Sequence, residues 1–253
     1  MTENSEIKAV QTAFEVVSEI READGAVGVS ELARQLDIPV STVHSHLKTL
    51  HDCEYVVRRE QKYDIGYRFL EDGGHRRSQT RLYQYAKPKV DQLADEFEDK
   101  VSLCVFDHGY SAHVYIAKGD ETVETDTFTG VRLPIHTSAG GKAILASLPE
   151  ERVEDVIERR GLDEHGPNTI TSREELLTEL DQIREEEMAY GRQERIEGIR
   201  SVAAPITQEG DQPDAAISVA APISRMTGER FEETIPERLT NIAQTISIKL
   251  RYA

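Results

Sequence analysis

The sequence predicts an α+β protein, with a small and mostly helical N-terminal region followed by a larger region of paired strands and helices. Hydrophobic residues near the N-terminus recur at spacings of three and four, as they do on amphipathic helices. Strand-like runs come in pairs further along the chain, which favours an antiparallel sheet. The 253 residues are enough for two domains that each bury a core.

Three helices and two short strands are expected in the N-terminal region. An apolar stripe indicates the first helix and consists of Ile7, Val10, Phe14 and Val17. Ser30 stands where the N-cap of the second helix is expected. The second helix is expected at residues 31–36, a turn at 37–39 and the third helix at 40–50. Two strands that form a wing follow at 55–60 and 62–65.

Two helices separated by a three-residue turn are typical of a helix-turn-helix, and the two strands complete a winged helix-turn-helix. The third helix turns Val43, Leu47 and Leu50 to one face, which leaves short polar side chains of the kind that contact base edges and phosphates. The alternative is a merely solvated polar face, which the turn spacing and the basic wing disfavour. The candidate DNA-contacting residues are Ser30, Ser41, Thr42, His44, Ser45, Lys48, Arg58, Arg59 and Lys62.

A polar segment with paired glycines at 71–78 is expected to link the two regions. We assign residues 1–67 to the winged helix-turn-helix, 68–86 to a linking helical region and 87–253 to the second domain. Helices in the second half are expected at 82–97, 140–148, 149–160, 172–188 and 230–250. Strands are expected at 101–106, 112–117, 121–128, 200–206 and 215–222, with turns at 107–111 and 208–214.

The charge balance is strongly acidic. Asp and Glu number 47 against 30 Lys and Arg, a net charge of −17, and the 21 arginines outnumber the 9 lysines. Carboxylates hold water and cations well, so this composition favours a salt-adapted protein, such as one from a halophilic archaeon. A mesophilic protein with an acidic surface is the alternative. The acidity does not exclude DNA binding, because residues 41–63 are locally basic and the Debye length is only about 3 Å at 1 M salt.

Several classes of protein are excluded by simple counts. No run of 18 apolar residues is present, so no membrane-spanning helix is expected. The first ten residues lack the pattern of a secretion signal, which predicts a cytoplasmic protein. Cys53 and Cys104 are too few and too far apart for a disulfide framework or a zinc knuckle. We expect no cofactor and no bound metal.

Two separate sets of motifs resemble the IclR-type transcriptional regulators. Residues 29–33 and 41–44 resemble the helix-turn-helix of that family. Residues 130–143 match its LPxHxxxxGKA stretch, and 198–205 and 216–219 match its last strands. The resemblance covers nearly the whole chain, with the motifs in the same order and at the same spacing.

This resemblance implies a winged helix that dimerises through its N-terminal and linking helices, joined to a GAF/PAS-like effector-binding and oligomerisation domain. Regulators of this type bind palindromic operators as dimers or dimers of dimers and respond to small organic acids, sugar-derived metabolites or aromatic acids. The effector pocket carried over by position comprises Ala139, Gly140, Gly141, Gly191, Ile199, Ser201, Ser218 and Ala220. Backbone N–H groups at the start of a helix near Gly140 suit a carboxylate, which serine hydroxyls can orient.

This chain departs from the family pattern at two places. Ser45 stands where many members have arginine, which predicts different operator contacts. Gly191 stands where many members have aspartate, and the neighbouring Arg192 would favour an anionic ligand if it pointed inward.

The sequence gives weaker support to three other functions: a phosphate-binding loop, a metal site and an enzyme active site. A phosphate loop at Gly141 lacks the Ser or Thr that should follow Lys142. Asp107, His108 and His113 could ligate a metal, but histidines of a hairpin usually lie in solvent.

A nucleophile–base pair of Cys104 or Ser138 with His136 would make an enzyme. A lone thiol on a strand is ordinary core, however, and no G-x-S-x-G motif is present. The sequence therefore predicts a ligand-responsive, DNA-binding regulator that is not an enzyme. The alternative is a small-molecule enzyme with an accessory DNA-binding head.

Overall fold

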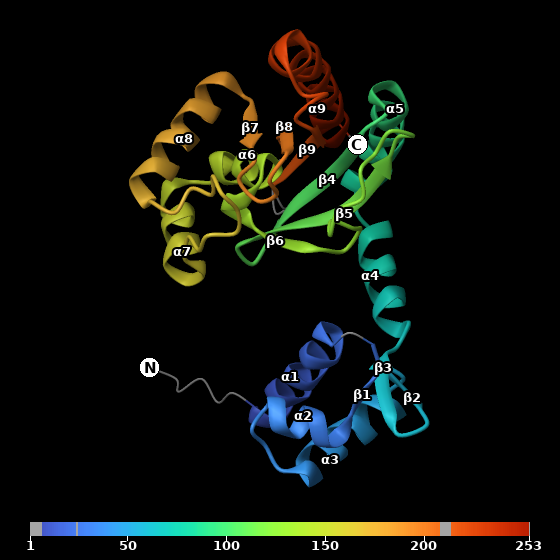
Figure 1. Ribbon diagram of the computed structural model, residues 1–253. Coiled ribbons are helices and arrows are strands. Elements are labelled where there is room, and N and C mark those ends of the chain that lie inside the picture. Colours follow the sequence, from blue (N-terminus) through green and yellow to red (C-terminus); the bar gives the residue numbers. More distant parts are fainter. Residues whose placement is uncertain (1–6, 24, 208–213, 253) are drawn as a thin grey trace. The chain divides into compact units, whose positions relative to one another are not determined.

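The computed structural model describes residues 7–23, 25–207 and 214–252 (Figure 1). Contacts divide the chain into two compact units, with the division after Arg76. This division falls inside the region 68–86 that the sequence assigned to the linking segment. The predicted turn at 208–214 lies outside the described residues except for Asp214. The α+β prediction is confirmed.

The first unit is a winged helix-turn-helix. Its three-stranded antiparallel sheet has the order β1-β3-β2. A buried cluster that includes Val43, Leu47 and Tyr63 joins the sheet to the helices. The short strand β1 was not predicted. The elements are α1 (Lys8–Glu22), β1 (Val27–Gly28), α2 (Val29–Gln35), α3 (Val40–Asp52), β2 (Val56–Arg59) and β3 (Lys62–Ile65).

The apolar stripe predicted on α1 faces away from the core of this unit. Ile7, Val10 and Phe14 are exposed, whereas the buried residues of α1 include Val16 and Ile20. The helix has apolar residues on two faces, and packing against α2, α3 and β3 selects the one that carries Val16 and Ile20.

Ser30 is not an N-cap, so that prediction is wrong. Helix α2 begins at Val29, and its N-cap is Gly28, which makes no side-chain hydrogen bond. Gly28 pairs with Lys62 in the sheet, so β1 runs directly into the helix and Ser30 lies exposed in its first turn.

The segment 71–78, expected to link the two regions, belongs to helix α4 (Arg68–Ser78), which lies within the predicted linking helical region 68–86. This helix buries none of its residues, and two polar contacts hold its start. Tyr55 Oη donates a 2.6 Å hydrogen bond to Asp72, and Arg68 pairs with Glu54 at 3.1 Å. The glycine pair within α4 does not interrupt it.

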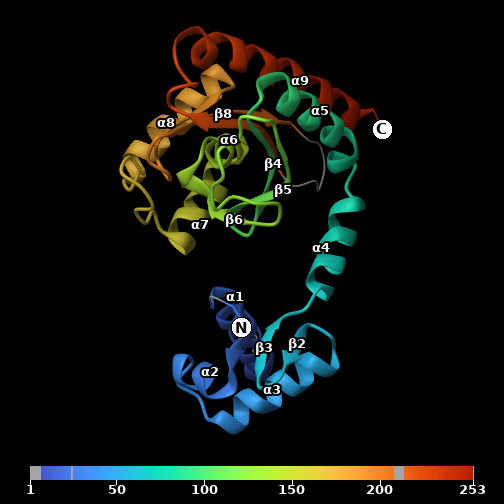
Figure 2. The ribbon, with the colours of Figure 1, turned by 45° about the vertical axis from the view of Figure 1, so that its right-hand side comes forward.

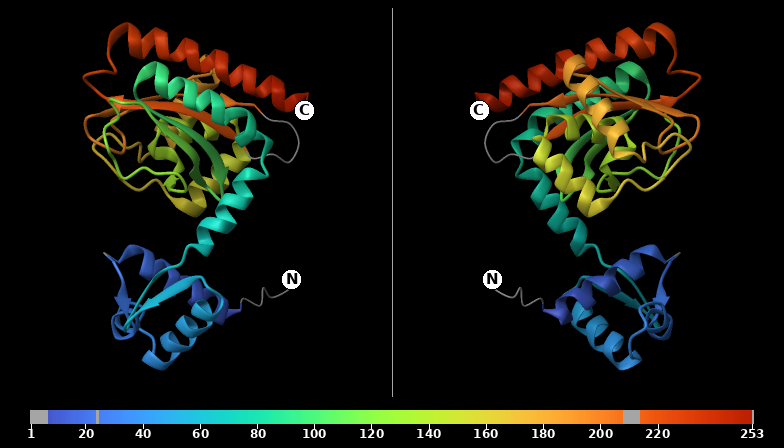
Figure 3. Two further views of the ribbon diagram at one scale, coloured as in Figure 1. Left: turned by 90° about the vertical axis from the view of Figure 1, so that its right-hand side faces the viewer. Right: turned by 90° about the vertical axis from the view of Figure 1, so that its left-hand side faces the viewer.

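The second unit is built on a six-stranded antiparallel sheet of order β6-β5-β4-β9-β8-β7. Helices α5 and α9 cover one face, and α6, α7 and α8 lie over the other (Figures 2 and 3). The strands are β4 (Lys100–Asp107), β5 (Tyr110–Lys118), β6 (Arg132–Pro134), β7 (Ala189–Arg192), β8 (Ile199–Ile206) and β9 (Ala215–Pro222). The helices are α5 (Arg81–Phe97), α6 (Ala139–Ser147), α7 (Glu150–Arg160), α8 (Arg173–Glu186) and α9 (Ile235–Arg251), with a short 3-10 helix at Ile135–Thr137 and a π-helical turn at Arg230–Thr234.

Alternation along β4 shows how the sheet serves two cores. Val101 and Leu103 belong to the cluster with α5 and α9. Cys104 belongs to the cluster with α6, α7 and α8. In the described part of the chain, no helix is long and apolar enough to cross a membrane.

The predicted strand at 121–128 is wrong, since this segment is an irregular loop. Its polar side chains bond to residues elsewhere instead of forming a ladder: Thr125 accepts a hydrogen bond from Lys100, and Asp126 pairs with Arg195. Conversely, the short edge strands β6 and β7 were not predicted.

Candidate nucleic-acid interface and ligand pocket

Helix α3 presents the predicted polar face to solvent. Ser41, His44, Ser45 and Lys48 are exposed, and Thr42 is half-buried. Ser45 Oγ donates to the carbonyl of Ser41 at 2.9 Å, which leaves the lone pairs of its oxygen free to accept. The helix therefore exposes donors, acceptors and one cation along a single face.

The wing places its three cations differently. Arg58 is tied to the turn of the wing, because its guanidinium donates to the carbonyl of Glu60 at 2.9 Å and to Gln61 at 3.0 Å. Arg59 and Lys62 lie opposite each other on β2 and β3 and are exposed. These two side chains form the available cationic pair of the wing.

A cavity of about 90 Å³ opens in the second unit between the sheet and the start of α6. Six of the eight predicted pocket residues line it: Gly140, Gly191, Ile199, Ser201, Ser218 and Ala220. Ala139 and Gly141 do not. Ala139 is fully buried in the core, and a Cβ on Gly141 would lie 1.9 Å from the carbonyl oxygen of Ile135. Gly141 therefore permits the close packing of α6 rather than contact with a ligand.

The register of the sheet sets the floor of this cavity. Gly191, Ser201, Ala220 and Lys100 lie directly opposite one another on the neighbouring strands β7, β8, β9 and β4. Directly paired residues point to the same face of a sheet. The adjacent row adds Ser218, which pairs with Ser102 on β4.

The start of α6 closes the cavity from above. Ser138 is its N-cap, and Ser138 Oγ accepts a hydrogen bond from the N–H of Gly141 at 3.2 Å. Among the described residues, the N–H groups of Ala139 and Gly140 have no acceptor. Free N–H groups at a helix start attract an anion.

Two cationic residues that were not identified from the sequence, Lys100 and Arg195, line the cavity. Lys100 is only 5% exposed and donates to Thr125 Oγ1. Burial lowers the pKa of Lys100, and the positive charge of Lys118 lowers it further. Arg195 forms a two-pronged ion pair with Asp126, at 2.7 and 2.8 Å. A charged residue on the pocket-facing side of β4, in alternation with Ser102, is the signal that could have identified Lys100.

Arg192, considered in the sequence as a possible pocket cation, does not line the cavity. It is exposed, and its guanidinium lies 5.0 Å from the ring of Tyr190.

Cys104 does not form with His136 the nucleophile–base pair that an enzyme would need. Cys104 lies against His113 rather than His136, with Sγ 3.7 Å from each ring nitrogen of His113. Burial raises the pKa of Cys104 to about 12 and lowers the pKa of His113 to about 4. Both groups are therefore neutral at pH 7. His136 instead lies 3.1 Å from the carbonyl oxygen of Asp163.

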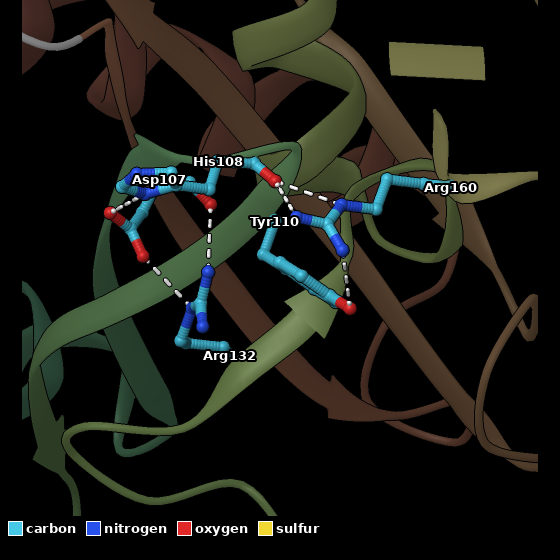
Figure 4. Close-up of polar contacts among 5 residues, drawn as sticks. All are labelled: Asp107, His108, Tyr110, Arg132 and Arg160. Atoms are coloured by element: carbon cyan, nitrogen blue, oxygen red, sulfur yellow. Dashed lines mark hydrogen bonds and ion pairs between the residues drawn. The ribbon is translucent and has the colours of Figure 1, made fainter. Parts of the chain in front are cut away.

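The candidate metal ligands are also separated. Asp107 ends β4 and His108 begins the turn to β5, and Asp107 contacts His108 and Arg132 at 2.9 Å each (Figure 4). Arg160 donates twice to the carbonyl of His108, so the turn is fixed by two arginines. His113 is buried beside the cavity, contrary to the expectation that it lies in solvent. No group of three or more metal-ligating side chains occurs in the described residues.

Comparisons with known proteins agree over almost the whole chain. The family model described as "Bacterial transcriptional regulator IclR C-terminal" matches residues 75–248, and the "IclR helix-turn-helix domain" matches residues 9–60. The probable HTH-type transcriptional regulator ArcR of Halobacterium salinarum is 30% identical over 98% of this chain and 95% of its own.

Two further comparisons give the same picture. The transcriptional repressor IclR of Escherichia coli is 30% identical over 90% of this chain and 85% of its own. The crystal structure of the Thermotoga maritima IclR has a TM-score of 0.75 at 26% identity and covers 97% of this chain and 99% of that one.

Proposed function

Because this chain belongs to the IclR family of DNA-binding transcriptional regulators, we propose that it binds a palindromic operator as a dimer or dimer of dimers and responds to a small carboxylate. It is a regulator and not an enzyme. We place its action in the cytoplasm, on double-stranded DNA.

The exposed polar face of α3 supports the proposed binding to DNA. The start of this helix enters the major groove, where His44, Ser45 and Lys48 meet base edges. Arg59 and Lys62 of the wing then contact phosphates, which positions the helix without specifying sequence. Arg58 contributes less, because the turn of the wing already uses its guanidinium.

The cavity in the second unit supports the proposed binding of an effector. A carboxylate bound at the start of α6 would accept a hydrogen bond from the free N–H of Gly140. The hydroxyls of Ser201 and Ser218 would orient this carboxylate. The metabolite then shifts the preferred spacing of the two DNA-contacting units of a dimer. The size of that shift is limited by the difference in its affinity for the two arrangements.

The outward stripe of α1 supports self-association. Ile7, Val10 and Phe14 are 69%, 51% and 62% exposed. A contiguous exposed apolar patch is typical of a protein–protein interface. A second copy of this chain, which offers the same stripe, satisfies a two-fold interface.

Footprinting on the DNA upstream of the protein's own gene, in high-salt buffer, tests this function. The wild type should protect a palindromic site. The double variant His44→Ala with Lys48→Ala should lose the protection while keeping its circular dichroism. Lys249→Ala, which removes an exposed lysine of the second unit, is the matched control and should bind normally. If genome-wide enrichment with the wild type finds no preferred site, the proposal is wrong.

A further inference from the structure

Lys100 is a buried cation without an ionic partner. Its side chain is 5% exposed, and its ammonium donates to the hydroxyl of Thr125. Within the described residues, no carboxylate lies at ion-pair distance from Lys100. Burying an ammonium without a counter-charge is unfavourable, so proteins rarely keep one that nothing neutralises.

The charged side chains Arg195 and Glu194, which also line the cavity, both have ionic partners. Arg195 is held by Asp126 at 2.7 Å. Glu194 lies 2.6 Å from the fully buried Lys142, which it shares with Glu179. His113 adds no charge at neutral pH, because burial lowers its pKa to about 4. Among the described cationic residues that line the cavity, Lys100 is therefore the one that forms no ion pair and is charged at neutral pH.

The position of Lys100 relative to the carboxylate site is set by the sheet. Lys100 pairs with Ala220, and Ala220 pairs with Ser201. Neighbouring strands lie about 4.8 Å apart, so the Cα atoms of Lys100 and Ser201 are about 10 Å apart on the same face. A ligand that begins at Ser201 and the start of α6 can extend along this row toward Lys100.

We propose that the effector of this protein is a compact organic acid with two anionic groups, and that Lys100 pairs with the second. This inference rests on the proposed function, which places the first carboxylate at the start of α6. The cavity of about 90 Å³ suits a backbone of a few carbon atoms. A second carboxylate and a phosphate would each present anionic oxygens to Lys100.

Calorimetric titration of the full-length protein with three acids tests the proposal. Succinate carries a second carboxylate, phosphoglycolate carries a phosphate, and butyrate has a single charge. The wild type should bind at least one of the dianions about tenfold or more tightly than butyrate, as expected for a charge-assisted contact in a water-poor site. Whichever dianion shows this gain identifies the second group.

Two lysine variants locate the effect. Lys100→Met keeps the length of the side chain and removes its charge. The variant should therefore bind the preferred dianion about as tightly as butyrate, while butyrate binding persists. Lys118→Met is the matched control and should keep the preference. Lys118 is the cross-strand neighbour of Lys100, pairs with Glu124 and does not line the cavity.

The outcomes separate this inference from the proposed function. If butyrate binds but neither dianion binds more tightly, the role of Lys100 is wrong and the carboxylate site stands. If Lys100→Met keeps the full preference of the wild type, the role of Lys100 is again wrong. If none of the three acids binds the wild type, the effector site itself fails. The comparison of acids on the wild type needs no variant and holds even if Lys100→Met does not fold.

Discussion

Lys142 Nζ lies 2.6 Å from Glu194 Oε1, and both side chains are buried. The same ammonium lies 2.6 Å from Glu179 of α8. The lysine thus ties α6, whose start closes the cavity, to a residue of the cavity wall. Because Glu194 follows β7, the contact fixes how the helix sits on the edge of the sheet.

Lys142→Met should destabilise the protein by about 3–5 kcal/mol, since removing one partner strands two carboxylates in or near the core. Chemical denaturation measures this. The deficit should shrink at acidic pH, because burial raises the pKa of Glu194 and protonation then neutralises this carboxylate. Adding Glu179→Gln and Glu194→Gln to the variant should recover much of the loss. A loss below about 1 kcal/mol would show that the cluster is not a structural clamp.

His113 should make the protein sensitive to acid. Burial lowers its pKa from 6.5 to about 4. The unfolded chain takes up this proton below pH 6.5 and the folded chain does not, so folding is favoured most above pH 6.5 and less as pH falls to 4. The loss is on the order of 3 kcal/mol.

The variant His113→Gln isolates this effect. Unfolding free energies of wild type and variant, measured from pH 7 to pH 4, should diverge, with only the wild type losing the contribution of His113. Other titrating groups cancel in the difference. Parallel curves would mean that the imidazole is not held neutral.

Gly191 leaves room for the hydroxyl of Ser201. A Cβ on Gly191 would lie 2.2 Å from Ser201 Oγ. Gly191→Ala should therefore displace this hydroxyl, destabilise the protein by about 1–3 kcal/mol and weaken carboxylate binding. Adding Ser201→Ala removes the clash, so the melting temperature of the double variant should exceed that of Gly191→Ala. If the alanine at 191 leaves both melting temperature and carboxylate affinity unchanged, the packing of Gly191 against Ser201 has been misjudged.

Hydrophobic periodicity predicted correctly which side chains of α3 are buried and which are exposed. Val43 and Leu47 are buried and the polar face of α3 is exposed, as periodicity indicated. Periodicity alone did not indicate that the apolar stripe of α1 faces outward, because the helix has two apolar faces and tertiary packing selects between them. The edge strands β6 and β7 are three and four residues long, too short for a clear alternation.

The pocket shows the same division. Motif resemblance placed six lining residues, but it did not find the two cations. The partner of Lys100 lies 25 residues away in an irregular loop, and that of Arg195 lies 69 residues away. Contacts of this kind depend on the folded loop and leave no periodic signal in the sequence.

The acidic surface should make stability depend on salt. A net charge of −17 repels itself in dilute buffer. Raising KCl from about 0.1 M to about 1 M shortens the Debye length from about 10 Å to about 3 Å, so the melting temperature should rise. Sucrose at matched osmolality is the control, because it does not screen charge. A melting temperature that KCl raises no more than sucrose does would favour a mesophilic protein with an acidic surface.

Phe14→Glu tests the apolar stripe of α1. Phe14 is 62% exposed and lies outside the core, so the substitution should leave the unit folded while placing a charge in the proposed interface. The wild type should sediment as a dimer or tetramer and the variant as a smaller species. Operator affinity should fall with it, because a monomer contacts one half-site at a time. Glu15→Gln, an exposed change on the same helix, should leave the mass unchanged. If the second unit also self-associates, Phe14→Glu takes a tetramer to a dimer rather than to a monomer. An unchanged mass would remove α1 from the interface.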